Sequence, residues 1–218
     1  MPYIGASVLY RERWEVHITA SIDQKLTMLK TLEEHLRIVK RLEDDFELIE
    51  KVATLMYSAV QNGRSIFWCG NGGSAADCQH LAAELVGRFE RSRKGLASVA
   101  LTTDSSILTS VSNDFGFECV FARQIEALCR PGDVVVGIST SGNSPNVCAA
   151  LVKAREIGCR TFAMTGETGG RLITLADHCL RVPSASTARV QEVHILAGHM
   201  LCDLIETQIC NHHESESA

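Results

Sequence analysis

The sequence predicts an α/β fold in which helices cover both faces of a doubly wound, five-stranded parallel sheet. Beyond residue 63, short continuous apolar runs alternate with helical patterns, as they do around strands that are buried on both faces. Two loops rich in glycine and serine, residues 70–74 and 139–144, each follow an apolar run and precede a helical pattern. Such strand-to-helix turns present backbone amides and hydroxyls to a small anion. The sequence therefore predicts a phosphorylated small molecule as the ligand of this fold.

Two amphipathic helices are predicted ahead of the sheet. Apolar side chains recur at three- and four-residue spacing over about residues 16–39 and again over about 44–60. Residues 1–14 show no clear period and are expected to be a loose extension. The helical pair, about 15–62, is expected to belong to a single domain of residues 15–210. Its apolar faces need a partner, which is either a neighbouring subunit or the chain's own domain.

The strands of the sheet are predicted from the apolar runs that follow. These runs are residues 65–69, 97–101, 133–138, 161–164 and 179–182. Runs of this length that do not alternate with polar residues are typical of parallel strands. A long helix over about 188–209 is expected to close the domain, and residues 211–218 are expected to form a C-terminal tail.

Composition narrows the classes of function. The chain has 218 residues and a formal net charge of −5, which gives no general attraction to nucleic acid or to anionic membranes. No apolar run is long enough to cross a bilayer. The nine cysteines occur singly, mostly inside apolar runs and without a C-x-x-C pair. This distribution is typical of reduced thiols, so a cytoplasmic protein without nucleic-acid or membrane partners is expected.

The loop at 139–144 gives the more specific of the two loop signals. It leads into Pro145, which suits the first position of a helix with Ser144 as its N-cap. Its four hydroxyls converge with free amides, and it lacks the lysine of a P-loop, so a monophosphate fits better than a nucleoside triphosphate. The loop at 70–74 is a weaker signal, because glycines in such a turn most often only turn the chain.

Two helices carry side chains that suit acid–base or metal chemistry. His80, Glu84 and Arg88 recur at four-residue spacing and share one face of the helix that follows the first loop. This face is either an exposed, salt-bridged surface or part of a site. Gln191 and His199 lie about two turns apart on the closing helix. The four residues His80, Glu84, Gln191 and His199 could together surround one divalent metal, for which zinc is chemically suited.

Several separated segments resemble the sugar isomerase (SIS) domain of the phosphoheptose isomerases. They are CGNGGSAADCQH (69–80), AELVGRF (83–89), NDFGF (113–117), GISTSGNS (137–144) and RVQEVHILAGH (189–199). The resemblance covers about residues 18–206 and implies a flavodoxin-like SIS fold. It also implies an isomerase that interconverts sedoheptulose 7-phosphate and D-glycero-D-manno-heptose 7-phosphate through a cis-enediol. That reaction is the first step of heptose synthesis for lipopolysaccharide or capsule.

The resemblance implies roles for individual residues. Glu84 becomes the base and His199 the acid, and the metal site of the family, zinc in some members, carries over to His80, Glu84, Gln191 and His199. The implied substrate contacts are Asn71, Gly72, Gly73, Glu84, Asn113, Asp114, Ser139, Thr140, Ser141, Ser144 and Gln191. Family members are homotetramers with sites between subunits, which would provide the missing partner of the N-terminal helices. Some relatives carry an aspartate near residues 186–188, and this chain has none there.

Two other functions remain open from the sequence. Some SIS domains sense sugar phosphates or bind a protein partner without catalysis, including a regulator that associates with the bacterial replication initiator. The segment 201–206 also resembles that regulator, but such relatives lose the catalytic pair, whereas Glu84 and His199 are both present here. The second alternative is an isomerase of a shorter sugar phosphate, such as arabinose 5-phosphate.

Overall fold

The computed structural model describes residues 22–216 of the chain. The chain divides into two units, Met1–Glu34 and His35–Ala218, and the sheet and the site described below lie in the second. The expected extension at residues 1–14 and the start of the first predicted helix lie outside the described residues. No helix within 22–216 has the length and apolar character needed to cross a membrane.

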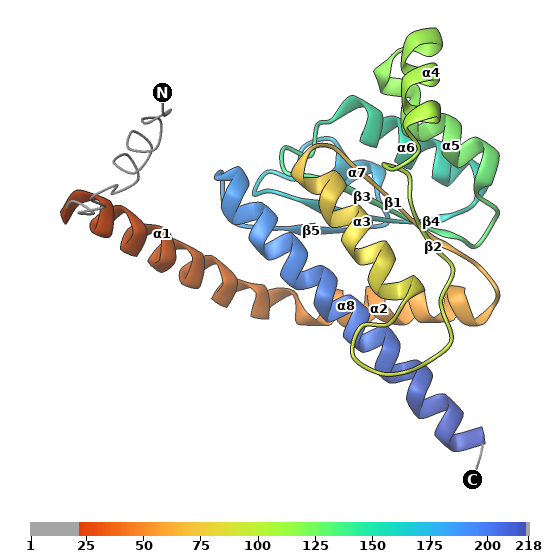
Figure 1. Ribbon diagram of the computed structural model, residues 1–218, viewed down its shortest axis with the longest axis horizontal. Coiled ribbons are helices and arrows are strands. Elements are labelled where there is room, and N and C mark those ends of the chain that lie inside the picture. The colour runs from red at the N-terminus through yellow and green to blue at the C-terminus, as the bar shows by residue number, and fades with distance from the viewer. Residues whose placement is uncertain (1–21, 217–218) are drawn as a thin grey trace, which may run out of the picture. The chain divides into compact units, whose positions relative to one another are not determined.

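Helices and strands follow one another in the predicted order (Figure 1). In chain order they are α1 (Ile22–Lys40), η1 (Arg41–Asp45), α2 (Phe46–Gln61), β1 (Ile66–Gly70), α3 (Gly73–Val86), β2 (Ser98–Ala100), α4 (Ser105–Phe115), η2 (Phe117–Cys119), α5 (Val120–Leu128), β3 (Val134–Ser139), α6 (Pro145–Ile157), β4 (Arg160–Thr165), α7 (Leu172–Leu175), β5 (His178–Arg181) and α8 (Thr187–Glu216). The last helix continues beyond residue 209 and includes most of the segment that was expected to be a tail. Residues 210–216 contain neither glycine nor proline, so nothing in the sequence stops the helix there.

The five strands form one parallel sheet in the order β2-β1-β3-β4-β5, which confirms the predicted fold class. Strands β1 and β3 are buried along their whole length. Their burial on both faces explains why the sequence shows continuous apolar runs instead of alternation. From β1, the chain adds β2 on one side and then β3, β4 and β5 on the other, so the direction in which strands are added reverses between β1 and β3. In open α/β sheets, such a switch point leaves a crevice at the carboxyl ends of the strands, where ligands bind.

Two hydrophobic cores lie on opposite faces of the sheet. Trp68, Val136 and Phe162 face the core that α2, α3 and α8 cover. Phe67 and Val135 face the core that α5 and α6 cover. Neighbouring residues of one strand therefore belong to different cores, as the two-residue repeat of a strand requires.

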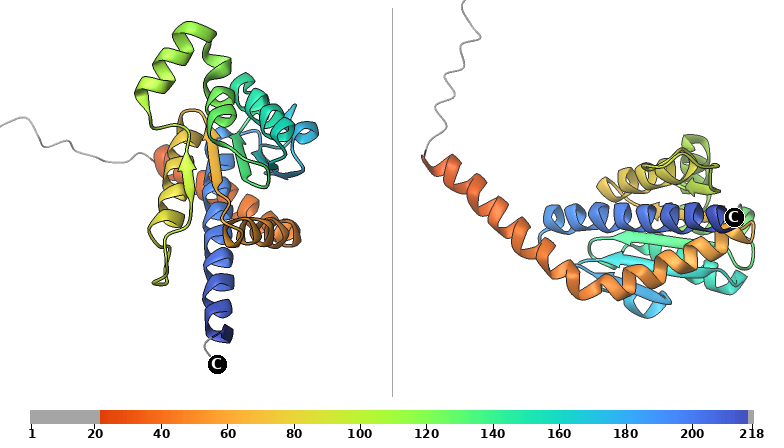
Figure 2. Two further views of the ribbon diagram at one scale, coloured as in Figure 1. Left: turned by 90° about the vertical axis from the view of Figure 1, so that its right-hand side faces the viewer. Right: turned by 90° about the horizontal axis from the view of Figure 1, so that it is seen from below.

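Helices α3 and α8 lie side by side on one face of the sheet and run in the same direction (Figures 1 and 2). Gly198 of α8 packs against Leu81 of α3, and a Cβ at residue 198 would stand only 2.5 Å from Leu81 Cδ1. Glycine at this position permits a close approach of the two helices. The seam between α3 and α8 therefore brings polar side chains of both helices within reach of one another.

Candidate active site

Three side chains meet beside the seam between α3 and α8. The Nε2 atom of His80 lies 2.8 Å from Nε2 of His199 and 3.3 Å from Oε1 of Glu84. His80 and Glu84 are one turn apart on α3, whereas His199 comes from α8. The carboxylate is about three-quarters buried, and the His80 side chain is half exposed. The structure thus places the residues expected to be base and acid beside one another, at the surface, together with His80.

These donors fit a divalent metal ion. One ligand atom from each of the three side chains lies within 4.8 Å of the others. Two imidazole nitrogens and one carboxylate oxygen form the type of donor set that holds zinc in catalytic sites with an open position. The imidazole nitrogens face each other, so without a metal one of them must donate a proton to the other.

Gln191, the fourth expected ligand, lies about two turns before His199 on α8. Its carboxamide covers the backbone of Gly73, where a Cβ would stand 2.5 Å from Gln191 Nε2. Gly73 begins α3 seven residues before His80, a distance of ~10 Å along a helix axis. The structure therefore brings His80, Glu84 and His199 together and places Gln191 beside the first glycine-rich loop.

The serine-rich loop forms a cradle at the carboxyl end of β3. Ser139 Oγ lies 2.9 Å from Ser144 Oγ and 3.4 Å from Ser141 Oγ. Ser144 occupies the N-cap position of α6 as expected, but its hydroxyl makes no capping hydrogen bond. The three hydroxyls face one another beside a helix N-terminus, an arrangement that suits a phosphate group.

A cavity of about 300 Å³ opens beside this loop. Its lining comes from the segments that follow β3, β4 and β5, and consists of Thr140, Ser141, Glu167, Thr168, Ser184, Ala185, Thr187 and Val190. Hydroxyl side chains make up most of this lining. The cavity therefore offers hydrogen-bond partners to a sugar phosphate at the edge of the sheet where ligands are expected.

Asn71, an expected substrate contact, is held by a residue that the sequence did not single out. The carboxamides of Asn71 and Asn146 form two reciprocal hydrogen bonds, in which each Nδ2 donates to the other residue's Oδ1 at 2.9 Å. Asn146 is only 2% exposed and lies in the first turn of α6. The sequence feature that could have identified Asn146 is its place as a polar residue between Pro145 and an apolar helical run. The pair joins the two loops across the switch point, where Gly72 turns the chain into α3 with a φ of +57°.

Asn113 and Asp114 stand apart from the other expected contacts. They are exposed at the end of α4, where the Asn113 amide donates a 2.8 Å hydrogen bond to Asp114. Figure 1 shows α4 projecting away from the seam of α3 and α8. Among the described residues, no hydrogen bond connects either side chain to the remaining expected site residues. In a single chain these two residues are therefore not part of the cluster.

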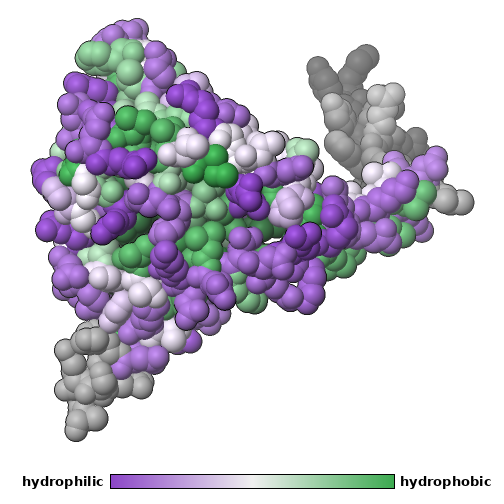
Figure 3. Space-filling view, turned by 180° about the vertical axis from the view of Figure 1, so that it is seen from behind, coloured by the Kyte–Doolittle hydropathy of each residue, from purple (hydrophilic) through white to green (hydrophobic). Residues whose placement is uncertain are grey.

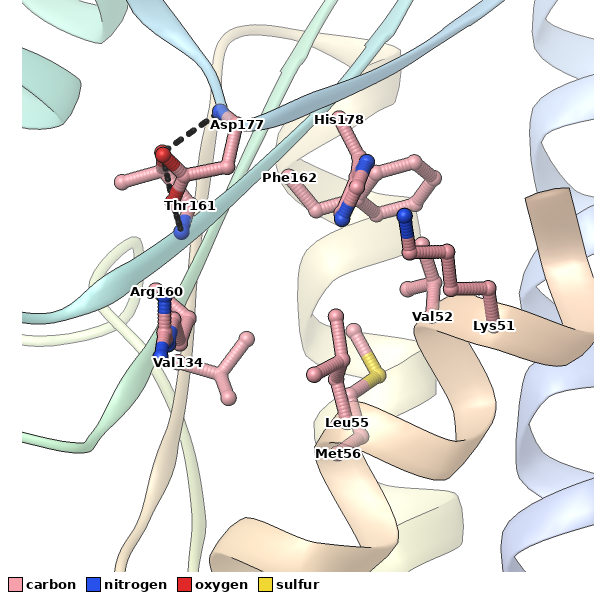
Figure 4. Close-up of a pocket in the computed structure, with 10 residues that line it drawn as sticks. All are labelled: Lys51, Val52, Leu55, Met56, Val134, Arg160, Thr161, Phe162, Asp177 and His178. Carbon is pink, nitrogen blue, oxygen red and sulfur yellow. Dashed lines mark hydrogen bonds between the residues drawn. The ribbon is translucent and has the colours of Figure 1, made fainter.

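A second cavity, of about 230 Å³, lies at the opposite end of the sheet (Figure 4). Its apolar part includes Leu55 and Met56 of α2, and its polar groups are Lys51 of α2 and side chains at the start of β4 and β5. The carboxylate of Asp177 there accepts hydrogen bonds from the backbone and the hydroxyl of Thr161. Because strands β3–β5 begin at this end, the cavity is remote from both loops and from the His80 cluster. It is not the candidate active site.

His194 is a framework residue of α8. It is fully buried, and its Nε2 atom donates a 3.1 Å hydrogen bond to the carbonyl of Thr165. Burial disfavours the charged imidazolium and lowers the pKa of His194 to about 4. The residue is therefore neutral at pH 7 and connects α8 to the end of β4.

We expect this histidine to make the protein sensitive to acid. The pKa of His194 is lower in the folded state than in the unfolded chain, so its contribution to stability is complete above pH 6.5 and is lost as the pH falls to 4. The difference amounts to about 3 kcal/mol. A His194→Gln variant keeps a hydrogen-bond donor but does not ionise. Urea unfolding at pH 4.5 and 7 should show a smaller loss of stability in this variant; equal losses would contradict the assignment.

Comparisons with known proteins identify the family to which the chain belongs. The SIS domain family model matches residues 32–166. The phosphoheptose isomerase of Aquifex aeolicus is 53% identical over 162 residues, which cover 74% of this chain and 85% of the relative. That of Geotalea daltonii is 56% identical over 161 residues, with 74% and 84% covered.

Solved structures give the same result. The structure of phosphoheptose isomerase GmhA from Neisseria gonorrhoeae matches with a TM-score of 0.80 and 44% identity, over 84% of this chain and 98% of that chain. A phosphoheptose isomerase from Francisella tularensis matches with a TM-score of 0.80 and 34% identity over the same shares. Sequence and structure together place the chain among the phosphoheptose isomerases, a family of isomerases built on the SIS domain.

Proposed function

We propose that this chain interconverts sedoheptulose 7-phosphate and D-glycero-D-manno-heptose 7-phosphate, the first step of heptose synthesis for lipopolysaccharide or capsule. The observation that carries the proposal is the meeting of Glu84, His199 and His80 at one seam. The relatives named phosphoheptose isomerase support the choice of substrate. A non-catalytic regulator is not favoured, because the residues expected to be base and acid are both present and adjacent.

The chemistry needs a base and an acid on the two carbons that exchange oxidation state. In the direction from ketose to aldose, Glu84 takes a proton from carbon 1 while His199 donates a proton to the carbonyl oxygen on carbon 2. The product of this step is a cis-enediol. Return of the proton from Glu84 to carbon 2, with transfer of the hydroxyl proton on carbon 1 to His199, completes the aldose and restores both groups. The two groups come from different helices, so their separation depends on the packing of α3 against α8.

His80, Glu84 and His199 are the residues that would hold a divalent ion, for which we propose zinc. A bound cation polarises the carbonyl and hydroxyl oxygens of a substrate. Gln191, whose carboxamide lies beside Gly73, is the fourth proposed ligand of the ion and also a proposed contact of the sugar. Oε1 of Glu84 faces His80, which leaves the second carboxylate oxygen for proton transfer.

We expect purified protein to contain about one zinc ion per chain. Replacement of His80 by alanine removes one ligand and should lower the bound zinc by more than ~10-fold. His178→Ala, at the cavity on the opposite end of the sheet, is the matched control and should retain the metal. Metal analysis after dialysis measures both. A wild-type protein that holds no metal and keeps full activity in chelator would remove the ion from the account.

The phosphate of the substrate is proposed to bind Ser139, Thr140, Ser141 and Ser144. Binding the phosphate far from the reacting carbons supplies energy that orients the sugar at Glu84. Asn71, Gly72, Gly73 and Gln191 lie at the first loop and are proposed to contact the sugar. The remaining proposed contacts, Asn113 and Asp114, need a site that is completed by another subunit.

We propose that the chain works as a homotetramer in the cytoplasm. Apolar side chains of α1 are about half exposed in the single chain (Figure 3); they are Leu26, Met28, Leu29, Leu32 and Leu36. Phe115 and Phe117 are also exposed, next to Asn113 and Asp114. Contact with other subunits would bury these side chains. All nine cysteines are free thiols, which supports a reducing compartment.

A panel of ketose phosphates tests the proposed substrate. We expect kcat/KM to be at least ~10-fold higher for sedoheptulose 7-phosphate than for ribulose 5-phosphate or fructose 6-phosphate, because a site discriminates by differential transition-state binding. Ribulose 5-phosphate is the ketose partner of arabinose 5-phosphate. A preference for it would therefore assign the chain to the isomerases of shorter sugars and contradict the proposal.

A further inference from the structure

A buried ion pair joins the segment after α3 to helix α8, next to the candidate active site. Arg93 Nε lies 3.1 Å from Glu206 Oε1, and the two side chains are 2% and 0% exposed. Glu206 follows His199 by seven residues, so both side chains lie on the same side of α8. Two charges without access to water are unfavourable unless each is fully hydrogen-bonded. Their other partners therefore indicate what the pair holds in place.

Glu206 holds the backbone of the segment that follows α3. Its carboxylate accepts hydrogen bonds from the backbone N–H groups of Phe89, Glu90 and Arg91 at 3.1, 2.8 and 2.7 Å. Burial alone would raise the pKa of Glu206, but these three donors and Arg93 hold that pKa below its usual range. Glu206 is therefore charged, and its oxygens are used to fix three consecutive residues.

Arg93 holds the end of α3. Its Nη2 atom donates a 2.9 Å hydrogen bond to the carbonyl of Glu84. Its Nη1 atom donates to the carbonyls of Leu85 and Gly87 at 2.8 and 3.2 Å. These are carbonyls that the end of a helix leaves without partners in the helix itself. The guanidinium thus fixes the last turn of α3, including the backbone from which the Glu84 side chain extends.

The segment held by Glu206 also supplies the neighbour of His199. The ring of Phe89 packs against the imidazole of His199 with 5.5 Å between the ring centroids. The imidazole of His80 also lies close to His199, with 5.0 Å between the ring centroids. The N–H group of Phe89 is one of the three that Glu206 binds. Glu206 therefore determines where the ring beside His199 lies.

We propose that Arg93 and Glu206 are positioning residues that set the separation and orientation of Glu84 and His199. Arg93 acts on Glu84, the base, by binding the backbone carbonyl of Glu84. Glu206 acts on His199, the acid, through the position of Phe89. The proposal rests on the proposed isomerase function of Glu84 and His199. A displacement of ~1 Å in such a pair is enough to lower turnover by ~100-fold.

The test compares two substitutions on the same helix. Glu206→Gln keeps the shape of the side chain but removes its charge. Asp203→Asn is the matched control, because Asp203 pairs with Arg91 of the same segment at 3.0 Å but remains about half exposed. We expect Glu206→Gln to lower kcat by ~10- to 100-fold with KM changed less than ~3-fold, because the phosphate loop is untouched. Asp203→Asn should stay within ~2-fold of the wild type.

Two further measurements separate positioning from a loss of fold. Amide hydrogen exchange of Glu206→Gln should be faster at residues 89–91 while the amides of β3 keep their protection. Phe89→Leu leaves the ion pair intact and removes only the ring beside His199. This variant should also lower kcat by a larger factor than that by which KM changes. Arg93→Lys should recover part of the activity lost in Arg93→Met, since lysine restores the charge but not the forked donors.

The outcomes are distinct. If the wild type isomerises sugar phosphates and folded Glu206→Gln is as active as Asp203→Asn, the positioning role is wrong. If Glu206→Gln does not fold, Phe89→Leu decides, and wild-type kcat in that variant overturns the proposal. If the wild type itself isomerises no ketose phosphate, the proposed function fails, and the positioning role fails with it. Exchange at residues 89–91 still reports whether Glu206 holds the segment.

Discussion

Replacement of Glu84 by glutamine should lower kcat by at least ~100-fold and leave the fold intact. Glutamine has nearly the same shape but does not accept a proton at neutral pH, so the enediol cannot form at the usual rate. His199→Ala should cause a loss of similar size, because the carbonyl oxygen then lacks its proton donor. Steady-state kinetics with a sugar phosphate measures both, and circular dichroism verifies the fold.

The control for these variants is a carboxylate on a helix that has no place in the site. Glu156, which pairs with Lys153 on the exposed surface of α6, is such a carboxylate. Glu156→Gln should keep turnover within ~2-fold of the wild type. Near-normal activity in Glu84→Gln or His199→Ala would contradict the assigned roles of base and acid.

Gly142→Ala should both destabilise the protein and weaken binding of the phosphate. Gly142 has a φ of +66°, and a Cβ there would stand 2.1 Å from the carbonyl oxygen of Gly169. Backbone lies on both sides of this contact, so the serine-rich loop has to move away. We expect a loss of about 2 to 4 kcal/mol in the free energy of unfolding from strain and overpacking together. KM for a sugar phosphate should rise by at least ~10-fold, because the hydroxyls no longer converge.

Gly63→Ala is the control that measures the cost of a positive φ without a steric contact. Gly63 has a φ of +69°, but a Cβ there would meet nothing within 4 Å. Gly63→Ala should therefore lose only about 1 kcal/mol and leave KM unchanged. Urea unfolding and steady-state kinetics on both variants give the comparison. Equal effects in the two variants would show that the contact with Gly169 has no part in shaping the loop.

Most of the sheet was predictable because its strands are buried on both faces. In a chain where helical patterns alternate with short apolar runs, a run such as 133–138 is interpreted as a parallel strand that helices cover on both faces. The four-residue spacing of His80 and Glu84 likewise placed both side chains on one face of a helix. Local spacing was sufficient in each of these cases.

Contacts between distant segments were not predictable from spacing. His199 meets His80 because Gly198 lets α8 approach Leu81, and no local pattern reports such a contact. Gln191, two turns earlier on α8, lies beside Gly73, and no local pattern reports that contact either. Arg93 and Glu206 are separated by more than a hundred residues, and each alone has the sequence context of a surface charge.

Isomerisation of sedoheptulose 7-phosphate in heavy water tests whether Glu84 carries the proton between carbons 1 and 2. We expect the zinc-loaded wild type to produce D-glycero-D-manno-heptose 7-phosphate with deuterium at carbon 2, because Glu84 exchanges its proton with solvent before returning it. Mass spectrometry and proton NMR of the product measure the label, and Glu84→Gln should form neither product nor label. Absence of the aldose product from the wild type, or aldose without deuterium at carbon 2, would contradict the role of Glu84 as the base.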